Sequence, residues 1–250
     1  MRNKKNRGRI VLLFFLVVVL LCLATIRVNQ DVKVKQPDTK PVIEEIKQET
    51  TIKKISEYRS ENDNDDIIAR LVIKDLEIDT LITKANNNSF YLNHDIHKNE
   101  SNLGNPFIDF RNSNNLSNER QINIYSHNSD YSVYQEQLPF YKLEKLFDKD
   151  NFDKVKKIEL YTEEEKSEYE IVALKVVTTD NEHTVLDSKS NERWEKHLDN
   201  LLSDTKYCRD DCKLNLEDKL LILQTCNYNP QGSYIILITK KLKGEIINER

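Results

Sequence analysis

Apolar residues gather into short runs along the chain, and long polar stretches separate these runs. The clearest run, residues 220–224, begins with four consecutive aliphatic residues and lies between polar segments, which is typical of a strand covered on both faces. Other runs of strand length occur at residues 67–73, 78–82, 107–110, 121–125, 157–161, 168–177 and 234–239. Eight short strands with few helices between them predict a closed or nearly closed β-barrel in a mainly β (α+β) domain.

Two segments place their apolar residues at helical spacing. Residues 141–147 follow Pro139 and carry an apolar face made of Leu143, Leu146 and Phe147. Residues 190–202 begin with a serine that can cap a helix, and their apolar face contains Trp194, Leu198, Leu201 and Leu202. We therefore expect one helix in the middle of the domain and a second helix inserted between the late strands.

The amino-terminal segment has the pattern of a membrane anchor. Residues 2–9 are rich in Lys and Arg, and residues 10–26 carry no charge. The apolar run is short for a bilayer span but longer than most signal-peptide cores, so we expect an uncleaved transmembrane anchor. Cleavage after Ala24 is the alternative. The basic flank, residues 1–9, should stay in the cytoplasm, which puts the rest of this single-pass protein outside the cell.

A polar stalk follows the anchor. Residues 27–62 are rich in Lys, Glu, Gln and Thr, and such a composition buries too little apolar surface to offset the entropy of ordering. Apolar residues recur at spacings of three and four between residues 43 and 58, so part of the stalk is expected to be a short helix lying on the domain. The folded domain is predicted at residues 63–250.

Charge and composition exclude several functional classes. The 250 residues carry a formal net charge of -4, whereas a protein that binds nucleic acid needs a concentrated basic face. The four glycines are scattered, so no phosphate-binding loop is present, and no His and Cys residues occur at metal-ligand spacing. We expect neither nucleic acid, metal nor organic cofactor.

Candidate chemistry lies at the ends of two predicted strands. Cys226 follows residues 220–224, where a strand fixes its Cβ while the thiol stays reachable from solvent. The alternative is a small buried hydrophobic residue, the commonest state of a free cysteine. His127 ends the alternating run at residues 121–127, and imidazole exchanges protons near neutral pH. We predict that the two strand ends bring Cys226 and His127 to one rim as a catalytic pair.

The remaining histidines lie in polar segments or on the solvated face of the predicted late helix. We predict that they are ordinary surface residues: His94, His97, His183 and His197.

Cys208 and Cys212 pose a separate question, because only three residues lie between them. A metal site would need two more soft ligands, and none is evident. A disulfide is sterically possible if the loop bends, and an extracellular location permits it. We favour this disulfide over two unpaired thiols.

Four segments resemble sortases, in the order found in that family. Ile-Leu-Gln-Thr-Cys at residues 222–226 resembles the Thr-Leu-x-Thr-Cys signature, and Ile-Tyr-Ser-His-Asn at residues 124–128 resembles the sortase histidine strand. Residues 91–95 and 104–112 resemble the segments that precede this histidine in class B sortases. The similarity runs from about residue 65 to residue 240 and therefore covers nearly all of the chain outside the amino-terminal anchor.

The resemblance implies a fold and an activity. Sortases have an eight-stranded barrel, and a helix inserted between the late strands distinguishes class B. The implied enzyme is an extracellular cysteine transpeptidase that recognises a sorting motif of the Asn-Pro-x-Thr type, or a related one, near the carboxyl end of a secreted protein. Cys226 would form a thioacyl intermediate and His127 would protonate the departing amine, after which a cell-wall peptide or pilin amine resolves the thioester. An inactive sortase-like binding protein and a hydrolytic cysteine peptidase are the alternatives.

The same resemblance nominates further site residues and exposes one departure. Candidates for substrate binding are Ser126, Asn128, Thr225 and Arg111. Sortases carry an arginine at the start of the strand after the cysteine, whereas here Tyr234 occupies that slot, and no arginine occurs between Cys226 and the last residue. A phenol donates one hydrogen bond and carries no positive charge. We therefore expect a slow enzyme in which Tyr234 or Arg111 partly replaces this arginine.

Overall fold

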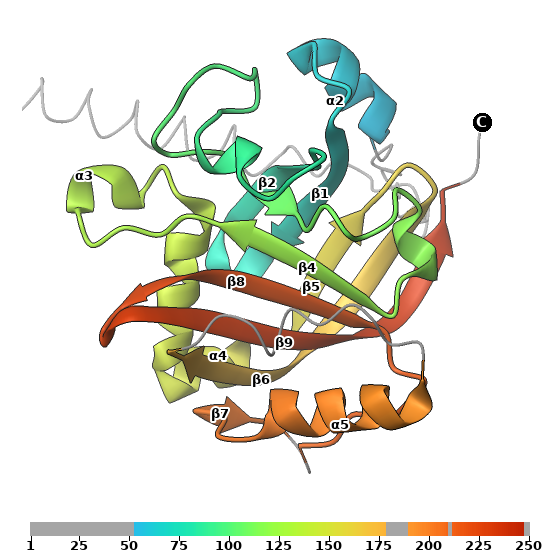
Figure 1. Cartoon of the computed structure of the whole chain (residues 1–250), viewed down its shortest axis with the longest axis vertical. Coiled ribbons are helices and arrows are strands. Elements are labelled where there is room, and N and C mark those ends of the chain that lie inside the picture. The colour runs from blue at the N-terminus through green and yellow to red at the C-terminus, as the bar shows by residue number, and fades with distance from the viewer. Residues whose placement is uncertain (1–52, 179–189, 210–211, 248–250) are drawn as a thin grey trace, which may run out of the picture. The chain divides into compact units, whose positions relative to one another are not determined.

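The computed structural model describes residues 53–178, 190–209 and 212–247. Within them the chain forms one mixed sheet (Figure 1). Its strands are β1 (Ile67–Ile73), β2 (Ile78–Thr83), β3 (Phe107–Ile108), β4 (Gln121–Ser126), β5 (Lys157–Tyr161), β6 (Glu165–Val177), β7 (Tyr207–Cys208), β8 (Leu220–Tyr228) and β9 (Gln231–Ile246).

Eight of these strands close into a barrel. The strand order is β5-β1-β2-β3-β4-β8-β9-β6, and an additional pairing between β5 and β6 joins the two ends. Two neighbouring pairs, β2–β3 and β4–β8, are parallel, and the others are antiparallel. The short strand β7 pairs with β6 outside this ring. The prediction of an eight-stranded, mainly β barrel is therefore confirmed.

The carboxyl-terminal strand is longer than its apolar core. Strand β9 pairs with β8 and continues along β6 as far as Ile246. Its second half is polar, and Lys–Glu pairs across the strands support it, such as Lys241 Nζ and Glu165 Oε1 at 2.7 Å. Charged cross-strand pairs stabilise a strand ladder without apolar alternation. The pattern of apolar residues therefore did not predict this half of β9.

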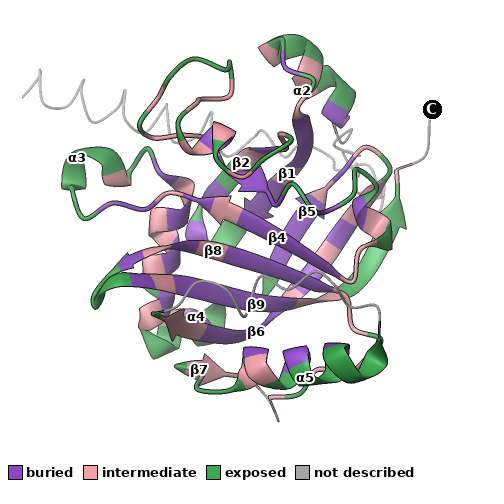
Figure 2. Cartoon of the chain, in the orientation of Figure 1, coloured by how far each residue is buried: buried purple, intermediate pink, exposed green. Residues whose placement is uncertain are grey.

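The barrel carries hydrophobic clusters on both faces of β8. Leu221 and Leu223 pack in the interior cluster, whereas Leu220 and Ile222 belong to an outer cluster beneath α5 (Asn191–Leu202). Buried residues of α5 lie on its side toward the sheet (Figure 2). Ser190 caps this helix by accepting a hydrogen bond from the backbone N–H of Arg193, as its sequence suggests.

The structure describes further short helical segments. They are α2 (Ile55–Asn62), α3 (Ser132–Gln135), α4 (Lys149–Lys154), and the 3₁₀ segments η1 (Lys74–Leu76), η2 (Phe90–Leu92), η3 (Leu116–Asn118) and η4 (Pro139–Phe147). The expected helix at residues 141–147 is thus a 3₁₀ segment, which buries Phe140, Leu143 and Leu146 in the interior cluster. Helix α2 lies in the range assigned to the stalk, yet it packs on β1 and buries Ile55.

One histidine prediction is wrong. His197 is buried on α5, and its Nε2 lies 2.7 Å from Gln121 Oε1. It follows Trp194 by three residues and therefore shares the face that packs on the sheet, where its ring contacts the indole.

Several predictions fall outside the described residues. They are the cytoplasmic tail at residues 1–9, the anchor at residues 10–26, most of the stalk, and His183. Among the helices that the structure describes, none has both the length and the apolar character needed to cross a bilayer.

Candidate active site

The parallel pairing of β4 with β8 brings the two candidate strands side by side. Its register runs from Gln121 opposite Leu220 to Ser126 opposite Thr225. His127 and Cys226 are the next residues on the two strands. The Thr225 hydroxyl donates a hydrogen bond to the Ser126 carbonyl at 2.8 Å, so side-chain contacts reinforce the last step of the ladder.

His127 and Cys226 line one cavity of about 460 Å³, together with the cross-strand tyrosine Tyr234. The other lining residues are Asn88, Leu92, Phe107, Tyr125, Ser126, Gln224 and Thr225. Neither Lys nor Arg occurs among the residues that the structure places on this lining. The described lining therefore carries no permanently charged side chain and mixes apolar with neutral polar groups.

Cys226 is a free, partly buried thiol on the outer face of the barrel. Side chains alternate along a strand, so Cys226 shares the face of Leu220 and Ile222. α5 covers that face at its beginning and leaves it open at Cys226. Strand β8 continues past Cys226 to Tyr228, so the residue lies within the strand and not at its end. Burial raises the pKa of the Cys226 thiol, which disfavours the thiolate and makes a nearby base necessary for nucleophilic attack.

His127 is oriented by the segment that precedes β3. Its Nε2 lies 2.8 Å from the Leu92 carbonyl, which accepts the hydrogen of that nitrogen. In the neutral ring Nδ1 is then the proton acceptor. Gly104 packs against the same place with a φ of +60°, and a Cβ there would lie 2.9 Å from the Leu92 carbonyl and 3.1 Å from His127 Cδ2. Only glycine permits this approach.

Tyr234 lies directly opposite Cys226 in the antiparallel pairing of β8 and β9. Directly opposed residues point to the same face of a sheet, so the phenol ring stands beside the thiol. Tyr234 also packs at the margin of the outer hydrophobic cluster.

Arg111 is held by another partner. Its guanidinium makes a forked contact with Asp109, with Nη2 2.7 Å from Oδ2, and Asp109 is fully buried. The Tyr125 hydroxyl donates to the same carboxylate at 2.8 Å. Burial opposes ionisation of Asp109, but the hydrogen bonds from Arg111 and Tyr125 outweigh it and lower the pKa of the carboxyl. Arg111 does not belong to the described cavity lining, but Asp109, which it contacts, bonds the lining residues Tyr125 and Asn88.

Asn128 is buried, as Ser126 and Thr225 are, but its side-chain amide is bound to protein groups. Its Nδ2 donates to Glu144 Oε1 at 2.6 Å and to the Cys226 carbonyl at 3.0 Å. Ser126 and Thr225, in contrast, line the cavity.

The chain has relatives of known family. No family model matches it. Sortase B of Listeria monocytogenes is 28% identical over 165 residues, which cover 66% of this chain and 64% of that protein. An X-ray structure of Clostridium perfringens sortase B is 26% identical, with a TM-score of 0.67 and coverage of 75% of this chain and 100% of that chain. The chain is similar to class B sortases in both sequence and fold. The matched region thus spans a little less than two thirds of the Listeria protein.

A sortase B complexed with triglycine has the same fold, with a TM-score of 0.66 at 20% identity over 76% of this chain and 86% of that chain. The resemblance to class B sortases is therefore confirmed in overall sequence and in fold. The roles of individual residues stay predictions.

The sortase-like motifs contain residues whose part at the site the sequence did not reveal. Leu92 and Gly104 lie in the two segments that resemble class B sortases, and both hold the ring of His127. Glu144 lies outside every motif. Its link to Asn128 depends on how the loop after β4 folds back over η4, which no local pattern encodes.

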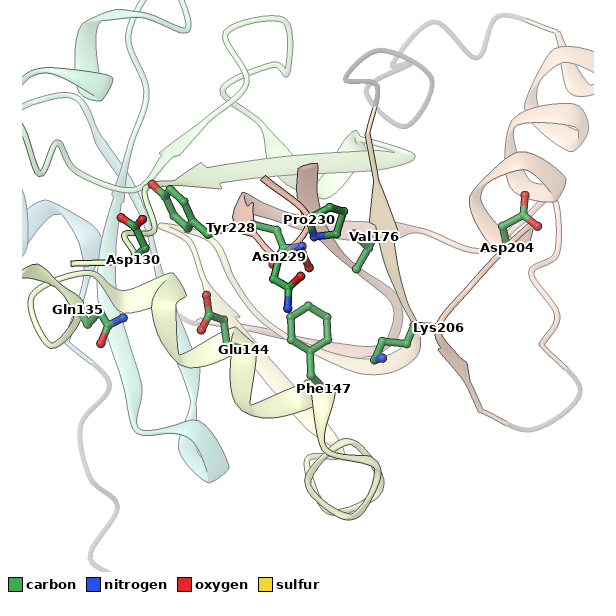
Figure 3. A pocket seen from close by; sticks show the side chains of 11 residues that line it. Asp130, Gln135, Glu144, Phe147, Val176, Asp204, Lys206, Tyr228, Asn229 and Pro230 are labelled. Carbon is green, nitrogen blue, oxygen red and sulfur yellow. The ribbon is translucent and has the colours of Figure 1, made fainter. Parts of the chain in front are cut away.

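A second and larger cavity, of about 760 Å³, lies at the β8–β9 turn (Figure 3). Its lining is Asp130, Gln135, Glu144, Phe147, Val176, Asp204, Lys206, Asn227, Tyr228, Asn229 and Pro230. It contains neither the thiol nor an imidazole, so the smaller cavity is the candidate active site despite its size.

Cys208 and Cys212 are joined by a disulfide, with their Cα atoms 5.5 Å apart. Cys208 lies on β7, and neither cysteine lines the cavity of Cys226. Within the described residues no group of three or more His, Cys, Asp or Glu side chains is placed to hold a metal ion.

Proposed function

We propose that the protein is a membrane-anchored, extracellular cysteine transpeptidase of the sortase B type. It cleaves a carboxyl-terminal sorting motif of the Asn-Pro-x-Thr type, or a related one, and transfers the cleaved protein to an amine. The observation that carries this proposal is the shared cavity of Cys226 and His127 at neighbouring ends of a parallel strand pair.

The proposed reaction proceeds in two acyl transfers. His127 takes the proton of the Cys226 thiol, and because Nε2 is committed to the Leu92 carbonyl, Nδ1 is the nitrogen available for this exchange. The sulfur bonds to the carbonyl carbon of the motif threonine, the C–N bond to the next residue breaks, and the departing amine takes the proton from His127. The resulting thioester retains enough free energy to acylate an incoming amine, which gives its proton back to the pair.

The proposed enzyme should stabilise its tetrahedral intermediates only weakly. Tyr234 is the side chain placed opposite Cys226, and its hydroxyl supplies one neutral donor at most. Loss of a charged or strong oxyanion donor typically costs about 3 kcal/mol, or two to three orders of magnitude in rate. Backbone amides near Cys226 are the alternative donors. We accordingly propose slow turnover.

Location and partners follow from the amino-terminal sequence and the family. Residues 1–9 are proposed to stay in the cytoplasm and residues 10–26 to cross the membrane, so that the barrel acts outside the cell. Its clients are then secreted proteins with a carboxyl-terminal sorting signal. The acceptor is an amine of cell-wall peptide or of a pilin.

A single assay separates this function from its two alternatives. The full-length chain in detergent is incubated with a fluorescence-quenched sorting peptide, with and without triglycine, the peptide present in a solved sortase B complex. A transpeptidase yields the triglycine-ligated product, and a hydrolytic cysteine peptidase yields only the free acid. Binding without cleavage indicates an inactive sortase-like protein. Cys226→Ala is the control and should yield neither product.

A further inference from the structure

We infer that Asn128 is a positioning residue, which fixes the backbone of Cys226 by tying its carbonyl to Glu144. The inference builds on the proposed function and assigns Asn128 a role other than substrate binding. Both hydrogens of its Nδ2 have acceptors, Glu144 Oε1 at 2.6 Å and the Cys226 carbonyl at 3.0 Å. Its Oδ1 accepts from the Ser129 backbone N–H at 2.7 Å. No donor of this buried amide is left for a substrate.

The contact lies where the strand ladder stops. Regular pairing of β4 with β8 ends at Ser126 and Thr225, one residue before His127 and Cys226. Beyond that point, two contacts hold the strand ends together. One is the bond from Asn128 to the Cys226 carbonyl, and the other runs from the Tyr228 hydroxyl to the Asn128 carbonyl at 2.9 Å. Asn128 therefore holds the ends of β4 and β8 in alignment beyond His127 and Cys226.

Glu144 connects this contact to a rigid part of the protein. It lies on η4, whose Phe140, Leu143 and Leu146 are fully buried in the interior cluster. Figure 3 shows Glu144 on this segment and Tyr228 at the end of β8, both on the lining of the larger cavity. The side chains of Glu144 and Asn128 thus link the Cys226 carbonyl to the segment that packs in the barrel core. A displacement of about 1 Å at a reacting group can cost about a hundredfold in rate.

The structure supplies a closely matched control. Asn112 is also buried, and its Nδ2 donates to the Gln121 carbonyl at 2.7 Å and to Glu119 Oε2 at 3.2 Å. Its Oδ1 accepts a backbone N–H, that of Asn123. Both asparagines therefore bridge a glutamate and a strand carbonyl, but Asn112 touches neither Cys226 nor His127. Asn→Asp removes both donors at either position and sets a carboxylate against the glutamate.

The test compares Asn128→Asp with Asn112→Asp in the full-length chain in detergent. We expect Asn128→Asp to lower kcat about 10- to 100-fold with KM within about twofold, because chemistry and not binding depends on the position of the thiol. Alkylation of Cys226 by iodoacetamide, measured on its peptide by mass spectrometry, should slow several-fold at pH 7.5. At pH 10, where the thiol ionises without a base, the rates should converge. Asn112→Asp should change stability but neither kcat nor alkylation.

A double variant separates positioning from a merely structural role. In Asn128→Asp with Glu144→Gln, the new amide can donate to the new carboxylate, which restores the contact between positions 128 and 144 but not the bond to the Cys226 carbonyl. We expect the melting temperature to recover and kcat to stay low. Recovery of kcat together with stability, or an equal loss of kcat in Asn112→Asp, overturns the inference. If Asn128→Asp does not fold, Glu144→Ala is measured in its place, and unchanged kcat and alkylation in that variant also overturn it.

The alkylation measurement keeps the inference distinct from the proposed function. A wild-type protein that turns over no sorting peptide refutes the transpeptidase proposal. The alkylation rates of Cys226 in the two asparagine variants still decide whether Asn128 positions the thiol.

Discussion

Tyr234 lies directly opposite Cys226 in the pairing of β8 with β9, on the outer face of the barrel. The sequence resemblance assigns Tyr234 to the slot of the sortase arginine. We predict that Tyr234→Phe lowers kcat/KM about tenfold or more, because the hydroxyl is the side-chain donor nearest in register to the thiol. Tyr234→Arg should raise kcat/KM, since guanidinium adds a fixed charge and further donors. Turnover of the quenched peptide measures both variants.

Arg111→Ala serves as the comparison, because Arg111 is held by Asp109 and does not line the cavity. We expect it to affect turnover less than Tyr234→Phe. If Tyr234→Phe matches wild type and Tyr234→Arg gains nothing, the tyrosine has no part in catalysis.

The second prediction concerns the ionisation of Cys226. Burial raises the pKa of this thiol, so folding favours its neutral form. In His127→Ala, which removes the nearby base, the alkylation rate of Cys226 should rise with pH to a midpoint above about 8.5, the usual thiol value. The same chain in denaturant should show a lower midpoint. A folded midpoint at or below that of the denatured chain contradicts the prediction.

Gly104 provides a third prediction, for which Gly232 is a matched control. Both glycines have positive φ, +60° and +77°, so alanine strains the backbone at each by about 1 kcal/mol. A methyl group on Gly104 additionally meets the carbonyls of Tyr91 and Leu92 and the ring of His127, whereas one on Gly232 meets nothing within 4 Å. We expect Gly104→Ala to lower both the melting temperature and kcat.

Gly232→Ala should lower the melting temperature slightly and leave kcat near the wild-type value. Equal effects of the two variants on kcat would show that Gly104 does not act through His127.

The fourth prediction concerns stability against pH. The carboxyl of Asp109 has a lowered pKa in the folded protein, so its contribution is present above the ordinary value and is lost as pH falls through the folded pKa. Asp109→Asn should lower the free energy of unfolding by about 3 kcal/mol at pH 7, because it leaves Arg111 and Tyr125 without their charged partner. Denaturant titrations at pH 7, 5 and 3 should show this difference shrinking below about pH 4. A difference that is constant across pH refutes the assignment.

The fifth prediction concerns topology. If residues 10–26 anchor the chain with its amino terminus inside, a membrane-impermeant thiol reagent should label Cys226 in intact protoplasts. The labelled peptide is identified by mass spectrometry. Labelling that appears only after lysis places the barrel on the cytoplasmic side and overturns the extracellular assignment.

The sequence predicted those parts of the fold that burial imposes on local pattern. The apolar runs at residues 67–73 and 157–161 coincide with β1 and β5, and Ser190 caps α5 as proposed. Strand β7 escaped notice because two residues cannot show a period. The spacing of apolar residues between 43 and 58 indicated a short helix lying on the domain, and α2, at residues 55–62, is a helix that contacts β1.

The arrangement of the candidate site depends on partners that are distant in sequence. A cysteine and a histidine that each follow an apolar run were identifiable from their types and positions, although β8 continues past Cys226 to Tyr228. However, nothing local indicates that Asp109 holds Arg111, that Glu144 meets Asn128, or that the Leu92 carbonyl fixes the ring of His127. Strand register decides these contacts, and register is a property of the closed barrel.

The parallel pairing of β4 with β8 also means that the proposed nucleophile and its base come together only in the folded chain. Ser126 and Thr225, the last pair of this ladder, are 99 positions apart in the chain. Contacts across so long a loop form late, because the loss of chain entropy precedes the gain from packing. Until the barrel closes, Cys226 has no imidazole beside it and reacts as an ordinary thiol. Folding therefore assembles the proposed catalytic pair, which no local segment of the chain contains.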